Sequence, residues 1–359
     1  MGGERFAALD GWRGIAACMV ALYHCRTYSH ISELGVVANA YLFVDFFFVL
    51  SGFVIAAGYG EPLARGFGTW RFMLLRFGRL YPLHIATLAA FVALDLARGQ
   101  PWPPDAFEAL LARVFLLHGT GLFDTQLWNS PSWTIGSEFL AYLVFALAVA
   151  VWRERAWRAM AAIALVGAVV IYAGVGTLSA KLGYEMLRCL YGFGAGVLSW
   201  HLFRRFHEDI PSGTLAEVVA LVAVILLVST VGTGPWTMLH PVAFCAALLV
   251  FAPQRGLASR VLASQPMGFL GAISYSIYMV HLFLAQRMAE VLRWAMEGRS
   301  GIVEPFATSK WAGDALVLAY LAIVVGVSAL TYRFIETPGR SYARRLAAYS
   351  SLPMTRSSE

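Results

Sequence analysis

The chain has 359 residues, of which 59% are hydrophobic and only 13% are charged. A soluble domain of this size carries about a quarter of charged residues, so the composition excludes a water-soluble globule and indicates extensive lipid-facing surface. The net charge is +6, but the basic residues lie between apolar runs rather than in one patch with aromatic residues, which argues against a nucleic-acid partner.

Long apolar runs predict an all-α, polytopic membrane protein with about ten transmembrane helices, because a helix needs about 20 mostly apolar residues to cross a bilayer. The first run contains Asp10 and Arg13 and has no cleavage site after it, so we expect a retained helix rather than a signal peptide. The expected spans are Leu9–Ser29, Ala38–Tyr59, Phe72–Leu96, Trp133–Val151, Met160–Val175, Leu187–Phe203, Leu215–Val231, Trp236–Phe251, Met267–Leu292 and Ala312–Phe334.

The arginines predict the orientation of these spans. Alternate connections, at 65–79, 153–158, 204–205 and 255–260, hold more arginines than the opposite loops, which predicts that both ends of the chain lie in the cytoplasm. One of the opposite loops, at 98–132, contains an amphipathic stretch at 107–117. We expect residues 1–340 to form one transmembrane domain and residues 341–359 to form a short tail, basic and then serine-rich, that frays.

The first expected helix carries three ionisable residues, Asp10, Arg13 and His24. Arg13 and His24 are eleven positions apart, which puts them on one helix face about 16 Å apart, and Asp10 falls close to that face. Ionisable groups inside a membrane are costly and are functional candidates by default. A purely structural interpretation fits the same pattern: Asp10 and Arg13 form an ion pair at the membrane interface, and His24 is a hydrogen-bonded packing residue.

Arg76 and Arg79 are three residues apart near the cytoplasmic start of the third expected helix, so they face the same way. Two guanidiniums at a membrane interface suit a phosphate or carboxylate group. Arginines that only set the topology by reaching lipid phosphates fit equally well.

Further polar residues lie in the fourth and ninth expected spans. Glu138 sits near the start of an apolar helix, where it could bind a hydroxyl, orient a histidine or complement the helix dipole. Tyr275, Tyr278 and His281 recur every three residues and form either a polar stripe or interfacial aromatic packing. Ser51, followed by a glycine, could allow a ligand to approach the second span closely.

The sequence contains no usable nucleotide or metalloprotease motif. The four cysteines lie inside apolar runs without metal-ligand spacing, so we expect buried free thiols and no metal site.

Seven short motifs, in order, resemble those of the acyltransferase family 3 membrane proteins, a large family of bacterial carbohydrate O-acetyltransferases. Thr134 and Thr337 stand where serine and lysine are usual in this family. The motifs are LDGWRGIAA at 9–17, Arg13-x10-His24, FFVLSGF at 47–53, RFGRLYP at 76–82, WTIGSE at 133–138, SYSIYMVH at 274–281 and FIETPG at 334–339.

The resemblance implies a ten-helix acyltransferase in the bacterial cytoplasmic (inner) membrane, surrounded by lipid and using acetyl-coenzyme A or another acyl-coenzyme A as donor. The implied acceptor is a carbohydrate or glycosylated molecule. Some family members carry an added extracytoplasmic hydrolase-like domain. We expect this chain to work without it, with the acceptor reaching the membrane core directly or with a separate extracytoplasmic partner; a homo-oligomer is equally compatible.

Acyl transfer needs an activated acceptor, a stabilised oxyanion and a held donor. We expect His24 to act as the general base, with Asp10 or Glu138 orienting it and Arg13 aiding the donor or the developing charge. A covalent route through His24 or Cys25 is the less favoured alternative, and a transporter or flippase for a lipid-linked glycan is the rival function. The residues expected to bind the donor are Arg13, Arg76, Arg79 and Tyr81, and those expected to contact the acceptor are Ser51, Trp133, Tyr275, Tyr278 and His281.

Overall fold

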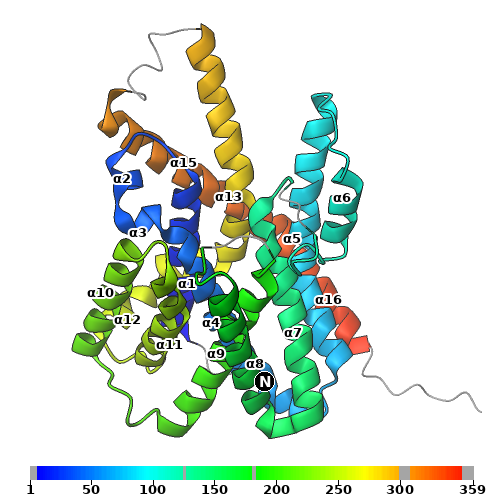
Figure 1. The fold of residues 1–359 in the computed structure, drawn as a ribbon, viewed down its shortest axis with the longest axis vertical. Coiled ribbons are helices and arrows are strands. Elements are labelled where there is room, and N and C mark those ends of the chain that lie inside the picture. The colour runs from blue at the N-terminus through cyan, green and yellow to red at the C-terminus, as the bar shows by residue number, and fades with distance from the viewer. Residues whose placement is uncertain (1–5, 124–126, 180–182, 299–307, 350–359) are drawn as a thin grey trace, which may run out of the picture.

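The computed structural model describes residues 6–123, 127–179, 183–298 and 308–349. Over these ranges the chain is helical with short connections and has no strand (Figure 1), which confirms the all-α expectation. The main helices are α1 (Ala7–His24), α2 (His30–Glu33), α3 (Gly35–Ala38), α4 (Phe43–Ala64), α5 (Thr69–Ala97), α6 (Ala106–Val114), α7 (Trp133–Trp152), α8 (Ala156–Gly174), α9 (Glu185–Phe206), α10 (Thr214–Thr230), α11 (His240–Phe251), α12 (Leu257–Leu262), α13 (Gln265–Gly298), α15 (Lys310–Thr331) and α16 (Thr337–Tyr349).

Every expected span overlaps one of these helices, namely α1, α4, α5, α7, α8, α9, α10, α11, α13 and α15. Five continuous helical stretches in the described residues are long and apolar enough to cross a membrane, and α10 and the helix around α11 are shorter apolar segments. The multi-pass architecture is therefore established, and the number of crossings stays a prediction. The five stretches are Ala40–Ala64, Thr69–Ala97, Ser130–Gly174, Gln265–Ala295 and Lys310–Ala348.

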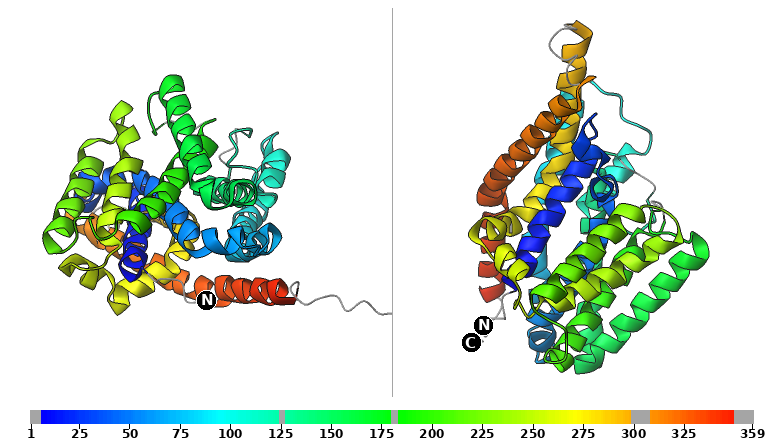
Figure 2. Two further views of the ribbon diagram at one scale, coloured as in Figure 1. Left: turned by 90° about the horizontal axis from the view of Figure 1, so that it is seen from below. Right: turned by 90° about the vertical axis from the view of Figure 1, so that its left-hand side faces the viewer.

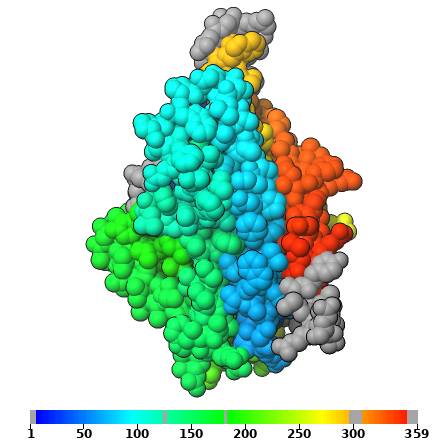
Figure 3. All heavy atoms as spheres, turned by 90° about the vertical axis from the view of Figure 1, so that its right-hand side faces the viewer, coloured from blue at the N-terminus to red at the C-terminus, as the bar shows by residue number. Residues whose placement is uncertain are grey.

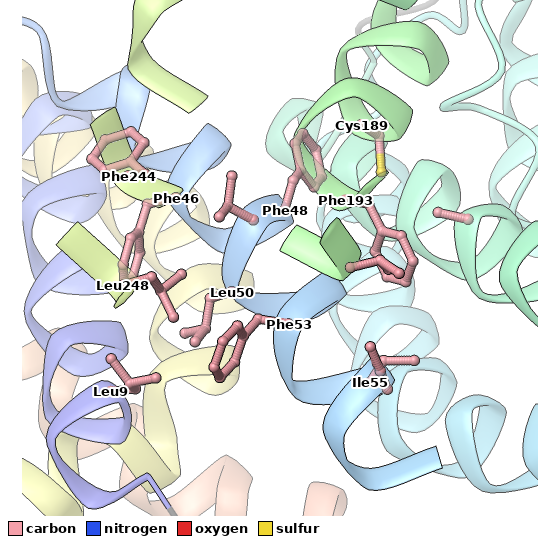
Figure 4. Close-up of a cluster of buried hydrophobic side chains, with 14 of the residues drawn as sticks. Leu9, Phe46, Phe48, Leu50, Phe53, Ile55, Cys189, Phe193, Phe244 and Leu248 are labelled. Carbon is pink, nitrogen blue, oxygen red and sulfur yellow. The ribbon is translucent and has the colours of Figure 1, made fainter. Parts of the chain in front are cut away.

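Helix α4 runs through the centre of the bundle, between α1, α7, α9 and α11. Its apolar residues are buried on several sides, as expected for a helix that is hydrophobic all round. Figure 4 shows Phe48 on the side of Phe193 from α9, and Phe46 on the side of Phe244 from α11. Because α4 is packed in this way, its polar residues have fixed positions inside the molecule.

Helices α1 and α13 pack closely, which sets the position of the first-helix motif. A Cβ atom built on Gly271 of α13 would lie only 2.2 Å from the carbonyl oxygen of Asp10. Small residues at such contacts let two helix backbones approach, as is common in membranes. The residues of α1 that follow Asp10 therefore lie directly beside the 274–281 motif of α13.

The half of the molecule drawn at the top of Figure 1 contains α2, α6, part of α15 and the ends of α5 and α13. Helix α6 coincides with the amphipathic stretch expected at 107–117. Arg98, which follows α5, donates to both carboxylate oxygens of Glu290 in α13, at 3.0 and 2.7 Å. This bidentate ion pair joins the ends of the two longest helices.

The C-terminal segment differs from the expected frayed tail. Residues 337–349 form α16, which packs along α5 with Ala343 and Ala347 buried. Alanines on one face allow this close packing. The frayed tail was expected from the basic residues that lie between these alanines. In the right-hand view of Figure 2, the start of α1 and α16 lie at the same end of the molecule, as expected for termini on one side of a membrane. Residues 350–359 lie outside the described residues.

Candidate functional site

Two neighbouring cavities collect most of the polar residues that the sequence analysis selected. The smaller has a volume of about 130 Å³ and the larger about 310 Å³. Val44 of α4 and Tyr278 of α13 line both cavities, so these two side chains form the wall between them. We call them the arginine cavity and the histidine cavity, after residues described below.

The arginine cavity is lined by Arg13, Arg76 and Arg79, which come from α1 and α5. Arg13 forms an ion pair with Asp10 at 3.1 Å, and its other donors reach α13, with Ser274 Oγ at 3.0 Å and the Gly271 carbonyl at 2.8 Å. Asp10 therefore fixes Arg13. Three guanidiniums around one cavity make it suitable for an anionic ligand.

Arg76 and Arg79 are each held by a residue of another helix. The Arg76 Nη2 atom donates to the hydroxyl of Tyr59 in α4 at 2.9 Å, and its guanidinium lies 4.8 Å from that ring. Arg79 Nη1 donates to Glu336 Oε1 at 2.9 Å. These contacts keep both side chains inside the protein at the cavity wall. Arginines that only set the topology by reaching lipid phosphates would not need such partners.

Glu138 of α7 also lines the arginine cavity, where two hydroxyl groups fix its carboxylate. Ser51 Oγ and the Tyr142 hydroxyl each donate to Glu138 Oε1 at 2.5 Å. Ser51 lies on α4, and Tyr142 lies one turn after Glu138 on α7. The expected acceptor contact Ser51 is thus a partner of Glu138 that also lines this cavity.

His24 is the last residue of α1 and lines the histidine cavity. Its Nδ1 atom lies 2.9 Å from the Val20 carbonyl and 3.3 Å from His281 Nε2. His281 Nδ1 lies 2.6 Å from the Tyr278 carbonyl, which can only accept, so His281 carries its proton on Nδ1 and accepts at Nε2. His24 Nδ1 faces two acceptors and must carry the proton, which makes Nε2 the basic atom of His24.

The residues that contact His24 differ from those expected from the sequence. Asp10 is fourteen residues earlier on the same helix, about 21 Å along its axis, and Glu138 lines the other cavity. Among the described residues, the Val20 carbonyl and His281, rather than either carboxylate, contact the His24 ring. His281 is fully buried behind His24 rather than exposed along an acceptor path.

The remaining predicted residues are distributed over both cavities. Trp133 lines the histidine cavity, and Tyr275 lines the arginine cavity, where its hydroxyl donates to the Leu80 carbonyl at 2.5 Å. Tyr278, in the dividing wall, accepts from Thr134 Oγ1 at 3.1 Å. Tyr81, expected to contact the donor, is outside the lining of both cavities in the described residues and stacks on Phe77 at 4.2 Å.

A buried ion pair in the wall of the histidine cavity was not predicted from the sequence. Arg188 of α9 lines this cavity and binds Asp45 of α4 through two hydrogen bonds of 2.8 Å. Both side chains are buried. An acid and a base inside two apolar runs were a visible signal, but nothing in their spacing of 143 residues indicated that they meet.

A second missed group is a histidine pair beside the same cavity. His118, in the connection after α6, lines the cavity and stacks on His84 with ring centroids 5.2 Å apart. Burial lowers the pKa of His118 to about 3. His118 is therefore neutral at pH 7, and its Nε2 lies 2.8 Å from the Ser132 carbonyl. This contact fixes the ring against the segment that precedes Trp133.

Comparison with known proteins agrees with the motifs. Residues 6–333 match a family model described as an acyltransferase domain. Protein 2 in the picA locus of Rhizobium radiobacter is 36% identical over 40% of this chain and 82% of that protein. The acyltransferase MdmB of Streptomyces mycarofaciens is 28% identical over 93% of this chain and 91% of its own length.

BcsY of Komagataeibacter xylinus, named for a membrane-bound transacylase activity, is 25% identical over 94% of this chain and 83% of its own length. No solved structure gives a significant match.

Proposed function

The chain belongs to the acyltransferase family whose model covers residues 6–333, and from this premise we propose that it is a membrane-bound O-acetyltransferase. The donor is acetyl-coenzyme A, taken from the cytoplasmic side. The acceptor is a hydroxyl group of a carbohydrate or a glycosylated molecule. A transporter for a lipid-linked glycan was the rival function, and membership of an acyltransferase family favours acyl transfer over it.

The observation that carries the proposal is the pair of cavities that share one wall. The arginine cavity offers Arg13, Arg76 and Arg79 to an anion, and the histidine cavity offers a basic nitrogen on His24. Tyr278 belongs to both linings. This arrangement supports a donor held on one side of Tyr278 and an acceptor hydroxyl on the other, so that the thioester meets the hydroxyl at the shared wall.

In the proposed reaction, His24 Nε2 removes the proton from the acceptor hydroxyl as its oxygen attacks the thioester carbonyl carbon. A new C–O ester bond forms and the C–S bond breaks, and the thiolate of coenzyme A takes up the proton from His24. The arginines hold the donor, whose phosphates they complement in charge. Arg13 is the candidate for stabilising negative charge that develops at the carbonyl oxygen.

The test is release of free thiol from acetyl-coenzyme A by the purified protein in detergent, with and without a panel of soluble glycosides, together with mass detection of acetylated product. We expect slow thioester loss alone, faster loss with a suitable glycoside, and a product heavier by one acetyl group. Folded protein that neither binds nor cleaves acetyl-coenzyme A and yields no acetylated glycoside contradicts the proposal.

A further inference from the structure

The motif at 334–339 has no part in the proposed reaction, yet it forms an unusual turn next to the arginine cavity. Residues Tyr332–Glu336 are π-helical and join α15 to α16. Such single π turns are rare and occur often at functional sites. Here the turn directs Glu336 into the bundle, where its side chain is fully buried.

Three donors from three different helices meet the Glu336 carboxylate. Arg79 Nη1 of α5 lies 2.9 Å from Oε1, and Ser276 Oγ of α13 lies 3.1 Å from Oε2. Arg340 Nη1 of α16 lies 3.4 Å from Oε1. A buried carboxylate in a membrane protein is costly unless it is paired and hydrogen-bonded in this way. Glu336 therefore joins an arginine of the cavity to an arginine of the C-terminal helix.

Helix α16 can approach this point because glycines remove the side chains at the contact. A Cβ atom built on Gly78, between Arg76 and Arg79, would lie 2.1 Å from the Cβ of Ala343. Figure 3 shows α16 in red alongside α5 in blue. The α5 turn that carries the cavity arginines is thus directly covered by the helix that carries Arg340.

Arg340 differs from Arg79 in its exposure. Its side chain is 35% exposed, against 19% for Arg79. Each guanidinium has five N–H donors, and the bond to Glu336 occupies one of them. Two arginines that share one carboxylate keep a net positive charge of one. Arg79 lies at the cavity wall, and Arg340 lies closer to the protein surface.

We propose that Glu336 is a positioning residue that holds Arg79 and Arg340 together as an anion-binding pair, and that this pair binds phosphate groups of the acyl donor. The inference rests on the proposed function, because it assigns the nucleotide end of the donor to this side of the arginine cavity. Arg79 contacts a phosphate at the cavity wall, and Arg340 contacts a phosphate closer to the protein surface.

The test is a double-mutant cycle read out as the KM for acetyl-coenzyme A and as kcat. Loss of a charge-assisted hydrogen bond weakens binding by about 10- to 100-fold, so we expect Glu336→Ala to raise KM by about tenfold with kcat changed little. Glu336→Gln keeps an oxygen that accepts from Arg79 and should restore part of the loss. Arg340→Ala, at the partly exposed end of the pair, should raise KM by about two- to fivefold.

Because Glu336 acts through Arg79 and Arg340, the double variant Arg79→Ala/Glu336→Ala should raise KM by less than the product of the two single effects. The matched control is Glu217→Ala. Glu217 is also fully buried and hydrogen-bonded, but to Gly256 and Ser259, outside the lining of both cavities in the described residues. We expect this control to lower stability and to leave KM unchanged.

Equal KM values for Glu336→Ala and Glu217→Ala, or KM effects of Glu336→Ala and Arg79→Ala that multiply, overturn the inference. An unchanged KM for Arg340→Ala removes Arg340 from the pair and overturns it as well. Wild-type protein that does not bind acetyl-coenzyme A overturns the proposed function itself, and that outcome is visible before any variant is made.

Discussion

The two cavities hold their polar groups by different means. In the arginine cavity, each charged side chain is fixed by a partner from another helix, as Arg76 is by Tyr59 and Arg79 by Glu336. In the histidine cavity, His24 is oriented by the Val20 carbonyl of its own helix and by His281. The first arrangement suits tight binding of a charged ligand, and the second leaves Nε2 of the His24 imidazole as an acceptor. On this basis we propose that the donor binds in the arginine cavity and that proton transfer takes place in the histidine cavity.

The variant His24→Ala tests most strongly whether the two cavities have separate roles. A general base contributes about 10²- to 10⁴-fold in rate, so we expect kcat for acetyl transfer to fall by that factor while the KM for acetyl-coenzyme A changes little. Thiol release measured over a range of donor concentrations separates the two parameters. A rise in KM with kcat retained contradicts the division between the cavities.

The second prediction concerns the stability that the buried ion pair gives to the wall of the histidine cavity. Asp45→Ala leaves Arg188 without its carboxylate in the wall of the histidine cavity, and removing one partner of a buried ion pair costs about 3–5 kcal/mol. We expect a marked drop in the temperature at which the detergent-solubilised protein aggregates. Glu61→Ala, at the exposed ion pair with Arg65, is the control and should change little. Equal thermal behaviour of the two variants shows that the pair is not structural.

Arg76→Ala tests the arginine cavity. Loss of a charge-assisted hydrogen bond costs about 1.5–3 kcal/mol, so the KM for acetyl-coenzyme A should rise by about 10- to 100-fold with kcat nearly unchanged. Arg71→Ala is the matched control, because Arg71 lies on the same helix but donates to the Ala347 carbonyl, outside the cavity lining in the described residues. If both variants raise KM equally, the effect comes from general surface charge.

The smallest expected effect belongs to His281. His281→Phe keeps the ring but removes the Nε2 acceptor beside His24, and a neutral hydrogen bond is worth about 0.5–1.5 kcal/mol. We expect kcat to fall by about two- to tenfold without a change in KM. Tyr320→Phe, which removes a hydroxyl bonded to the His281 carbonyl, should have a weaker effect. A change in KM alone is the opposite result and places His281 in binding.

Much of the fold could be predicted from the sequence because a bilayer demands long apolar helices, and each expected span overlaps a helix. The shared face of Arg76 and Arg79 was also predictable, because it depends on local helix geometry. Their partners Tyr59 and Glu336 were not, since these lie 17 and 257 residues away and pairing between helices is set by packing. Similarly, no spacing on α1 indicated that His281 rather than Asp10 would contact His24.

The central claim is that donor binding and proton transfer lie in separate cavities. Equilibrium binding of radiolabelled acetyl-coenzyme A to wild type, His24→Ala and Arg76→Ala tests it most directly. We predict that His24→Ala binds the donor with the Kd of wild type although it does not turn over, and that Arg76→Ala binds it at least about tenfold more weakly. Equal weakening of donor binding in both variants contradicts the claim.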